Sequence, residues 1–263
     1  MKIAVISDIH GNLAALQAVL ADIDARGFDA IINAGDTLGG PLASARTSDL
    51  LMTRQVPMIA GNHERQVLTL PRERMNASDA CTDSEMEPHH RAWLASAPPT
   101  CWLTDDVFVC HGTPESDLDY WLETVTPDFR PDGSPGVRAA SLAEATARLG
   151  TGLHARKASL IICGHTHVPR VVRLPSASLS TGITVLNPGS VGLPAYDDVH
   201  PYFHHIQTGS PHARYASARR TPLGWHVDLH SVPYDYSGMA DLARSRGRMD
   251  WAHALETGFA LPA

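Results

Sequence analysis

Eight side chains that could bind metal ions or move protons follow short apolar runs or glycine-led turns. They are Asp8, His10, Asp36, Asn62, His63, His111, His165 and His167. Carboxylate, imidazole and amide ligands together suit borderline divalent ions such as Mn, Fe, Zn or Ni rather than metals that thiolates select. A set of this size exceeds one tetrahedral site and fits two five- or six-coordinate sites that share one carboxylate.

Each of these residues taken singly has a simpler explanation. Asp8 could cap a helix that starts near Gly11, and Asn62-His63 could form an ordinary turn. The pattern recurs at the ends of successive apolar segments, which argues against coincidence. A later group of histidines fits no such pattern, and we predict solvated loop residues there rather than a further metal or substrate contact; these are His200, His204, His205 and His212.

The elements that must position these residues alternate between strand and helix. Apolar runs predict strands at 2–7, 30–33 and 56–60, and helical periodicity predicts helices at 13–26 and 43–54. Such alternation predicts a parallel sheet with right-handed crossovers. Ligands bind outside the carboxyl ends of such strands, which is where the polar side chains stand.

The remainder of the chain predicts a second, largely antiparallel sheet and additional helices. We predict one domain over 1–263, with 65–98 and 113–150 as cap or lid insertions and 237–257 as a C-terminal helical tail. Residues 65–98 look helical, and 115–137 look like a long irregular loop. Further elements are predicted as a hairpin at 101–110, a helix at 141–149, a strand at 160–163, strands of the second sheet at 168–174, 183–186, 214–218 and 225–232, and a helix over 237–257 broken near Gly247.

Composition narrows the classes of partner. The chain has 263 residues, 43% of them hydrophobic, and a formal charge of −7, which argues against non-specific nucleic-acid binding. The sequence has no apolar run long enough to span a membrane and no signal-peptide pattern. The four cysteines form no Cys-x-x-Cys pair, which favours free thiols in a reducing compartment. We expect a soluble, cytoplasmic protein.

Taken in order, five short motifs resemble those of the calcineurin-like metallophosphoesterases. They are Asp8-x-His10, Gly35-Asp36, Gly61-Asn62-His63-Glu64, His111 and Gly164-His165-x-His167. The turn Asn187-Pro-Gly-Ser-Val-Gly192 further resembles the small bacterial and archaeal branch, which includes phosphodiesterases. The resemblance implies an α/β fold, a four-layer α-β-β-α sandwich of two mixed sheets flanked by helices.

The resemblance also implies a dinuclear metal centre. Asp8, His10 and His167 would hold the first divalent ion, and Asn62, His111 and His165 would hold the second. Asp36 would bridge the two, and manganese is the favoured metal among Mn, Fe, Zn and Ni. In the family a hydroxide that bridges the metals attacks the phosphorus atom.

His63 is the expected catalytic residue, because its family counterpart stabilises the transition state or protonates the leaving group. Glu64 stands where larger members of the family have an aspartate, so the motif does not identify the group that orients His63. Asn12, on the turn after His10, is a candidate substrate contact.

The predicted function is hydrolysis of a small phosphodiester, with a nucleotide-type diester as a candidate substrate. Phosphomonoesterase and dinucleoside-polyphosphate hydrolase are close alternatives, and a protein phosphatase is less favoured because the chain is short. A non-catalytic interaction module, like the retromer subunit that shares the fold, is a remote alternative that predicts eroded ligands. The sequence leaves room for a homo-oligomer.

Overall fold

Two facing sheets form the centre of the computed structural model, which describes residues 1–130, 133, 136–151 and 158–262. The first sheet has the order β13-β12-β1-β2. Its strands are β1 (Lys2–Ile6), β2 (Ala30–Asn33), β12 (Ala213–Thr221) and β13 (Gly224–Val232). The second sheet has the order β3-β4-β7-β9-β8. Its strands are β3 (Cys101–Thr104), β4 (Val107–Val109), β7 (Leu160–Ile162), β8 (Arg170–Leu174) and β9 (Ile183–Asn187).

Both sheets are mixed: the parallel strands lie at the centre of the second sheet, whereas in the first sheet they are β1 and the edge strand β2. β1 pairs in parallel with β2, and β7 pairs in parallel with both β4 and β9. The other pairs within these two sheets are antiparallel. The carboxyl ends of the parallel strands therefore share one end of each sheet.

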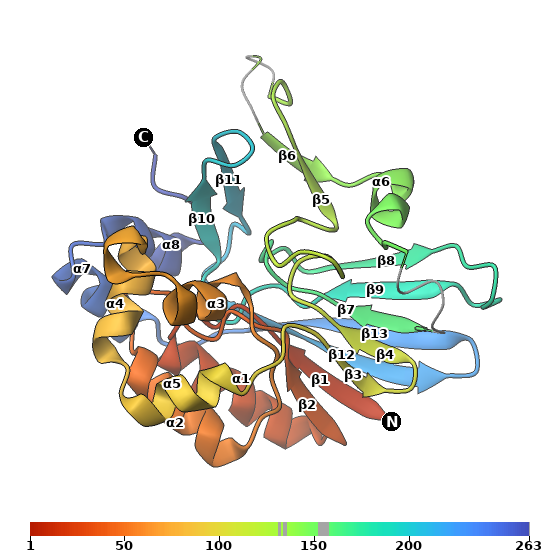
Figure 1. Cartoon of the computed structure of the whole chain (residues 1–263), viewed down its shortest axis with the longest axis horizontal. Coiled ribbons are helices and arrows are strands. Elements are labelled where there is room, and N and C mark those ends of the chain that lie inside the picture. The colour runs from red at the N-terminus through yellow and green to blue at the C-terminus, as the bar shows by residue number, and fades with distance from the viewer. Residues whose placement is uncertain (131–132, 134–135, 152–157, 263) are drawn as a thin grey trace.

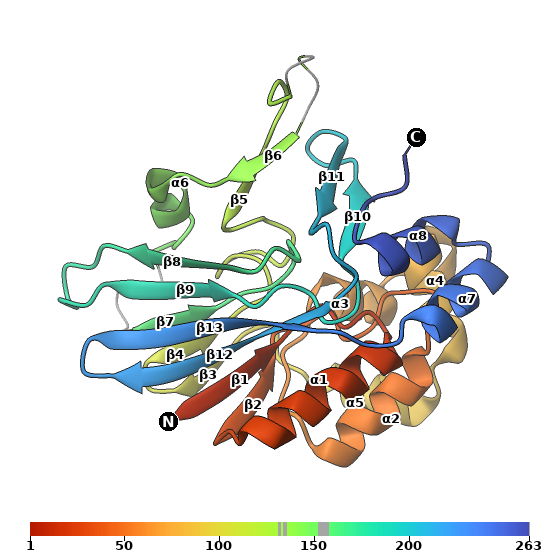
Figure 2. The same ribbon diagram turned by 180° about the vertical axis from the view of Figure 1, so that it is seen from behind.

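Alternation along β1 explains the layering, because successive side chains of a strand point to opposite faces. Ile3 and Val5 pack between the sheets, against Val109 and Ile162 of the second sheet among others. Ala4 and Ile6 pack outward, in the same cluster as Leu16 and Val19 of α1 (Leu13–Arg26). Figures 1 and 2 show α1 and α2 (Ser44–Arg54) along the outer face of the first sheet.

The outer face of the second sheet has a thinner cover. Phe108 and Ile161 pack against Trp121 of the following loop and against Ala145 of α6 (Leu142–Ala147). The predicted four-layer α/β sandwich of two mixed sheets is confirmed, with one short helix and a loop as its fourth layer.

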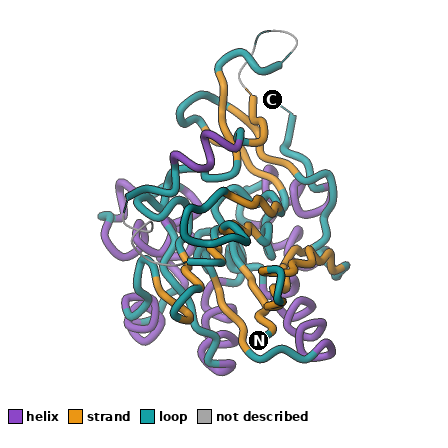
Figure 3. Tube along the Cα trace, turned by 90° about the vertical axis from the view of Figure 1, so that its right-hand side faces the viewer, coloured by secondary structure: helices purple, strands orange, loops and turns teal. Residues whose placement is uncertain are grey.

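The remaining helices lie in the segment after β2 and in the C-terminal tail. α3 (Asn62–Thr69), a 3₁₀ turn at Arg72–Arg74, α4 (Ala77–Glu85) and α5 (Pro88–Ala95) fill the predicted 65–98 insertion. α7 (Ser237–Ser245) and α8 (Met249–Thr257) fill the range 237–257, and the break falls at Gly247 as predicted. The two chain ends lie at opposite ends of the molecule (Figure 3). None of the helices in the described ranges is long and apolar enough to cross a bilayer.

Two strand predictions are wrong. The predicted strand at 56–60 is a single parallel bridge between Asn33 and Met58, because Pro57 has no N–H to donate and α3 begins soon afterwards. The strands predicted as one antiparallel sheet are divided: β8 and β9 join β7, whereas β12 and β13 join β1. Both assignments depend on pairing between segments far apart in the chain, which local patterns do not encode.

Two small hairpin sheets were not predicted. β5 (Glu123–Thr126) pairs with β6 (Gly136–Ala139) inside the expected irregular loop, and β10 (Ala195–Asp198) pairs with β11 (His204–Gln207). Both project from the same side of the sandwich (Figures 1 and 2). His204 and His205 are consequently strand residues, the first buried and the second partly buried, and their prediction as solvated loop residues is wrong.

The packing of α1 leads to a stability prediction. Leu16 is fully buried, and replacing it with alanine leaves a cavity, so Leu16→Ala should lower the free energy of unfolding by about 2–5 kcal/mol. Gln17 is exposed on the same helix, and Gln17→Ala should change it by about 0.5 kcal/mol or less. Urea unfolding of the metal-free protein measures both. Equal effects would contradict the burial assigned to Leu16.

Candidate metal centre

The predicted ligands converge where the parallel strands end. Asp8 and His10 follow β1, Asp36 follows β2, and His111 follows β4. His165 and His167 follow β7, while Asn62 and His63 open α3. Three overlapping groups have their ligand atoms within 4.8 Å of one another: Asp8, His10 and His167; His10, Asp36 and His63; and Asp36, His111 and His165.

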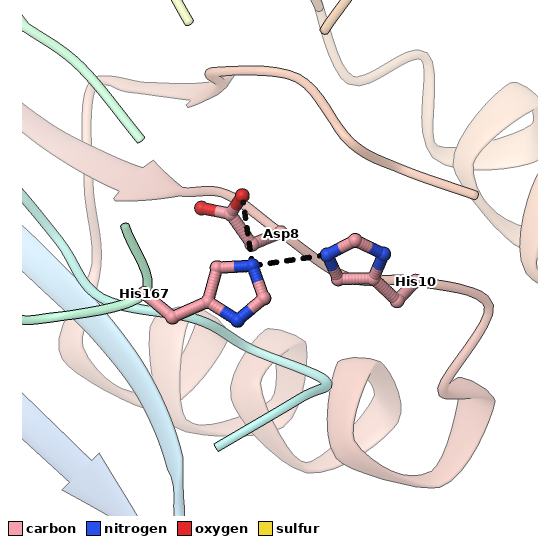
Figure 4. Close-up of side chains that lie close together, drawn as sticks. All are labelled: Asp8, His10 and His167. Atoms are coloured by element: carbon pink, nitrogen blue, oxygen red, sulfur yellow. Dashed lines mark hydrogen bonds and ion pairs between the residues drawn. The ribbon is translucent and has the colours of Figure 1, made fainter. Parts of the chain in front are cut away.

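The side chains meet at distances that suit a shared cation. His167 Nε2 lies 3.1 Å from His10 Nε2 and 3.4 Å from Asp8 Oδ1, as Figure 4 shows. His111 Nε2 lies 3.0 Å from Asp36 Oδ2 and 3.9 Å from Asp8 Oδ1. The two histidine nitrogens that face one another leave their lone pairs for a common partner.

Unpaired buried oxygens support the same conclusion. Asp8 Oδ2 and Asn62 Oδ1 are buried and have no hydrogen-bond partner among the described residues. Leaving such atoms unpaired costs about 1–3 kcal/mol each, and more for a charged group. Two divalent cations would satisfy these atoms, one each, so the residues present fit the two metal ions that the resemblance implies.

The second nitrogen of each histidine fixes which nitrogen faces the centre. The Nδ1–H groups donate to backbone carbonyls: His10 to Gly39 at 3.2 Å, His111 to Ala34 at 2.8 Å and His167 to Leu193 at 2.7 Å. Because Nδ1 holds a proton for its carbonyl, Nε2 is the nitrogen that a metal can bind once the ring is neutral. His165 is reversed: its Nε2–H donates to Leu118 O at 3.0 Å, so its Nδ1 faces inward.

The backbone is forced into an unusual conformation at these turns. Among the residues that the structure describes, six other than glycine have positive φ, and five of them are expected ligands: Asp8, His10, Asp36, His165 and His167. Such conformations cost of order 1–3 kcal/mol each and cluster at functional sites. Gly61 is needed for a different reason, because a Cβ there would collide with Asp36 Oδ1.

Glu64 braces the turns rather than orienting His63. Its buried carboxylate accepts backbone N–H bonds from Asp36 at 2.9 Å, Gly61 at 2.9 Å and Leu38 at 3.1 Å. Burial, together with the charge of Asp36, raises the pKa of Glu64 to about 7. Both oxygens are thus committed to holding two ligand-bearing turns together.

His63 pairs instead with a residue that the sequence analysis missed. Its Nδ1 lies 2.5 Å from Oδ1 of Asp79, a buried residue on α4. Burial would lower the pKa of His63, but the charges of Asp36 and Asp79 outweigh it and raise the pKa to about 9. The Asn76-x-x-Asp79 pattern marks a helix start, which gives no sign that the carboxylate has another partner.

The carboxamide of Asn12 makes its hydrogen bonds within the fold. It is buried and caps α1, since its Oδ1 accepts from Ala15 N at 3.1 Å. Its Nδ2 donates to Gly192 O at 2.9 Å and Tyr234 Oη at 3.0 Å. The carboxamide is therefore fully used within the fold, which does not support the prediction of a substrate contact. Because Asn12 is the cap, Asp8 is free to face the metal centre.

A cavity of about 1220 Å³ opens over the centre, and His10, Asp36, Asn62, His63, His165 and His167 lie in its wall. The segment 113–122 covers one side and is tied down at several points. Arg65 makes two bonds to Asp117, at 2.6 and 2.9 Å. Tyr120 Oη lies 2.8 Å from Tyr196 Oη and 3.1 Å from His204 Nε2.

A fourth group, Asp49, His89 and His90, lies apart from this cavity. Nδ1 of His90 accepts from Glu87 N at 3.2 Å, so Nε2 carries the proton and donates to Asp49 at 2.9 Å. Both ring nitrogens are then in use. This ring is held for structural reasons rather than for metal binding.

Comparison with known proteins agrees with this geometry. The family model of the calcineurin-like phosphoesterase superfamily domain matches residues 1–209. The chain therefore belongs to the calcineurin-like phosphoesterase superfamily, a class of metal-dependent phosphoester hydrolases.

Individual relatives are more distant. A metallophosphoesterase from Sphaerobacter thermophilus has a similar structure, with TM-score 0.67 and 25% identity, over 98% of this chain and 100% of that one. The hypothetical protein PH1004 from Pyrococcus horikoshii shares the fold, with TM-score 0.72, 16% identity and 99% of each chain covered. The uncharacterized protein MJ0912 of Methanocaldococcus jannaschii is 44% identical over 66 residues, which are 25% of this chain and only 27% of that relative.

The charges at the centre predict proton release when metal binds. Burial lowers the pKa of His111, but Asp36 and Asp8 outweigh it and raise the pKa to about 10 in the metal-free protein. Burial and the neighbouring His167 lower the pKa of His10 to about 3. At pH 7.5 His111 must therefore lose a proton to bind a metal, whereas His10 has none to lose.

We expect manganese affinity to rise with pH between about 7 and 9. Calorimetric titration in two buffers of different ionisation enthalpy counts the protons released. The His111→Ala variant should release about one proton fewer than His10→Ala, which also removes one imidazole ligand. An equal count for the two variants would contradict the charged His111–Asp36 pair.

Proposed function

We propose that this protein hydrolyses a small phosphodiester, of nucleotide type, at the metal centre described above. The observation that carries the proposal is the convergence of the expected ligands, two of which keep unpaired buried oxygens that face no other partner in the described chain. Membership of the phosphoesterase superfamily supports the reaction class. The four cysteines are free, which supports the prediction of a reducing, cytoplasmic location.

We assign the ligands as the resemblance implies. Asp8, His10 and His167 would hold one divalent ion; Asn62, His111 and His165 would hold the other; and Asp36 would bridge them. When bound, such ions supply positive charge for the phosphoryl oxygens and a water acidic enough to ionise near neutral pH. Manganese remains the favoured metal.

His63 is the residue that would move a proton. Its ring lies 5.2 Å from that of His10, centroid to centroid, and its side chain is 19% exposed in the cavity wall. Its Nδ1 is occupied by Asp79, so Nε2 is the nitrogen left to give a proton to the leaving oxygen. General-acid catalysis of this kind typically contributes about 10²–10⁴-fold in rate.

The cavity supports a diester as the substrate. Its volume of about 1220 Å³ leaves room for substituents on both sides of one phosphate. Aromatic walls at Tyr120, Tyr196 and Trp251 suit a flat organic group such as a nucleobase. Phosphomonoesters and dinucleoside polyphosphates are the alternatives that activity measurements must separate.

A substrate panel tests the proposal. Manganese-loaded protein should hydrolyse bis-p-nitrophenyl phosphate and 2′,3′-cyclic nucleotides faster than p-nitrophenyl phosphate or diadenosine tetraphosphate, and chelation should abolish each activity. Release of p-nitrophenol and chromatography of the nucleotides measure the rates. Preference for the monoester or the tetraphosphate would favour those alternatives. No turnover with any tested metal would favour a non-catalytic module.

Replacing His63 separates catalysis from metal binding. We predict that His63→Ala keeps both metals and loses about 10²–10⁴-fold in kcat on esters with poor leaving groups. The loss should be much smaller for p-nitrophenolate, which leaves without a proton. Emission spectroscopy of metal content and steady-state kinetics measure the two effects. A parallel loss of metal would contradict the assignment of His63 as a catalytic residue.

A further inference from the structure

We propose that Asp79 is the positioning residue for His63, so that α4 supplies the carboxylate that the Gly61-Asn62-His63-Glu64 turn does not. This inference rests on the proposed role of His63 in phosphoester hydrolysis.

The contact itself is direct and buried. Asp79 Oδ1 lies 2.5 Å from His63 Nδ1, and the carboxylate side chain has no exposed surface. Because a carboxylate only accepts, the Nδ1 of His63 must carry the proton. The hydrogen bond therefore sets both the tautomer and the orientation of the ring, and it leaves Nε2 facing the cavity.

Asp79 is held rigidly enough for this role. Its second oxygen accepts from Asn76 Nδ2 at 2.8 Å, and its backbone N–H donates to Asn76 Oδ1 at 2.9 Å. One turn later, Thr82 Oγ1 accepts from Gly39 N at 3.1 Å and from Gly40 N at 3.2 Å. These bonds fix the start of α4 against the turn that follows Asp36.

Neighbouring positions cannot replace it. Glu64 uses both carboxylate oxygens on backbone N–H groups, as described above. A side chain at Gly39 would collide with the imidazole ring of His63. Among the residues that the structure describes, Asp79 is the carboxylate bonded to His63 through a ring nitrogen.

The decisive variant is Asp79→Asn, which keeps the shape and removes the charge. We expect kcat for a diester with a poor leaving group to fall by about 10- to 100-fold, with KM, metal content and turnover of bis-p-nitrophenyl phosphate little changed. In the His63→Ala background the same substitution should have no further effect, because the two residues act as one unit. Asp83→Asn is the matched control, since Asp83 lies on the same helix and pairs with Arg72 and Arg91 instead.

A second readout does not depend on activity. The hydrogen-bonded Nδ1 proton of His63 should give a downfield imidazole resonance in the metal-free protein. It should disappear in His63→Ala, move upfield in Asp79→Asn and stay unchanged in Asp83→Asn. If Asp79→Asn does not fold, Asn76→Ala is the substitute. It removes a hydrogen bond that holds Asp79 but keeps the carboxylate, so the fall in kcat and the upfield shift should both be smaller.

The outcomes distinguish the two proposals. Full activity of His63→Ala on poor leaving groups would overturn the role of His63 itself. If His63→Ala loses activity on esters with poor leaving groups and Asp79→Asn does not, only the positioning role of Asp79 is overturned. Equal loss on good and poor leaving groups, or loss of metal, would show that Asp79 is merely structural.

Discussion

Charged and polar side chains buried at one end of the two sheets are the constraint on which the rest of the structure depends. Asp8 and Asp36 have essentially no exposed surface, and burying a carboxylate is costly unless it is paired. Burial alone would raise the pKa of Asp36, but the charges of His111 and His63 outweigh it and hold that pKa well below its usual range. The buried acidic and imidazole groups of the centre therefore stabilise one another, and bound cations would pair with the atoms that remain unpaired.

That constraint reaches the backbone through the turns. Most of the ligands lie on the turns that follow strand ends, where each side chain must point inward to reach the centre. Positive φ at Asp8, Asp36 and His165 achieves this, and the missing side chain of Gly61 admits Asp36. Glu64 then joins the turn after β2 to the turn before α3. The apolar layers on both sides of β1 supply the stability that offsets this local strain.

How much of this was predictable from the sequence varies with the range of the interaction. The ligand turns were predicted because strand, turn residue and ligand are adjacent in the chain, as in Asp8 and His10 after β1. The division of the later strands between the sheets was not, because β12 pairs with β1 across more than 200 positions. Asp79 was missed for the same reason: its contact with His63 links two helices, and the local pattern explains it fully as part of a helix start. His204 was misjudged because it belongs to no motif, although the hydroxyl of Tyr120 and the β10–β11 hairpin hold it in a buried position.

The walls of the cavity are not independent of the metal centre. The ligand turns come from motif residues, whereas the aromatic part of the wall comes from segments without a motif, around Tyr120 and β10. Yet Tyr120 packs on His165 with ring centroids 5.1 Å apart, and Tyr196 packs on His167 at 4.6 Å. The carbonyl of Leu118, two residues before Tyr120, determines which nitrogen of His165 faces inward. Because the same short segment shapes the cavity and orients a ligand, a change in that segment alters the space for substrate and the geometry of the metal centre together.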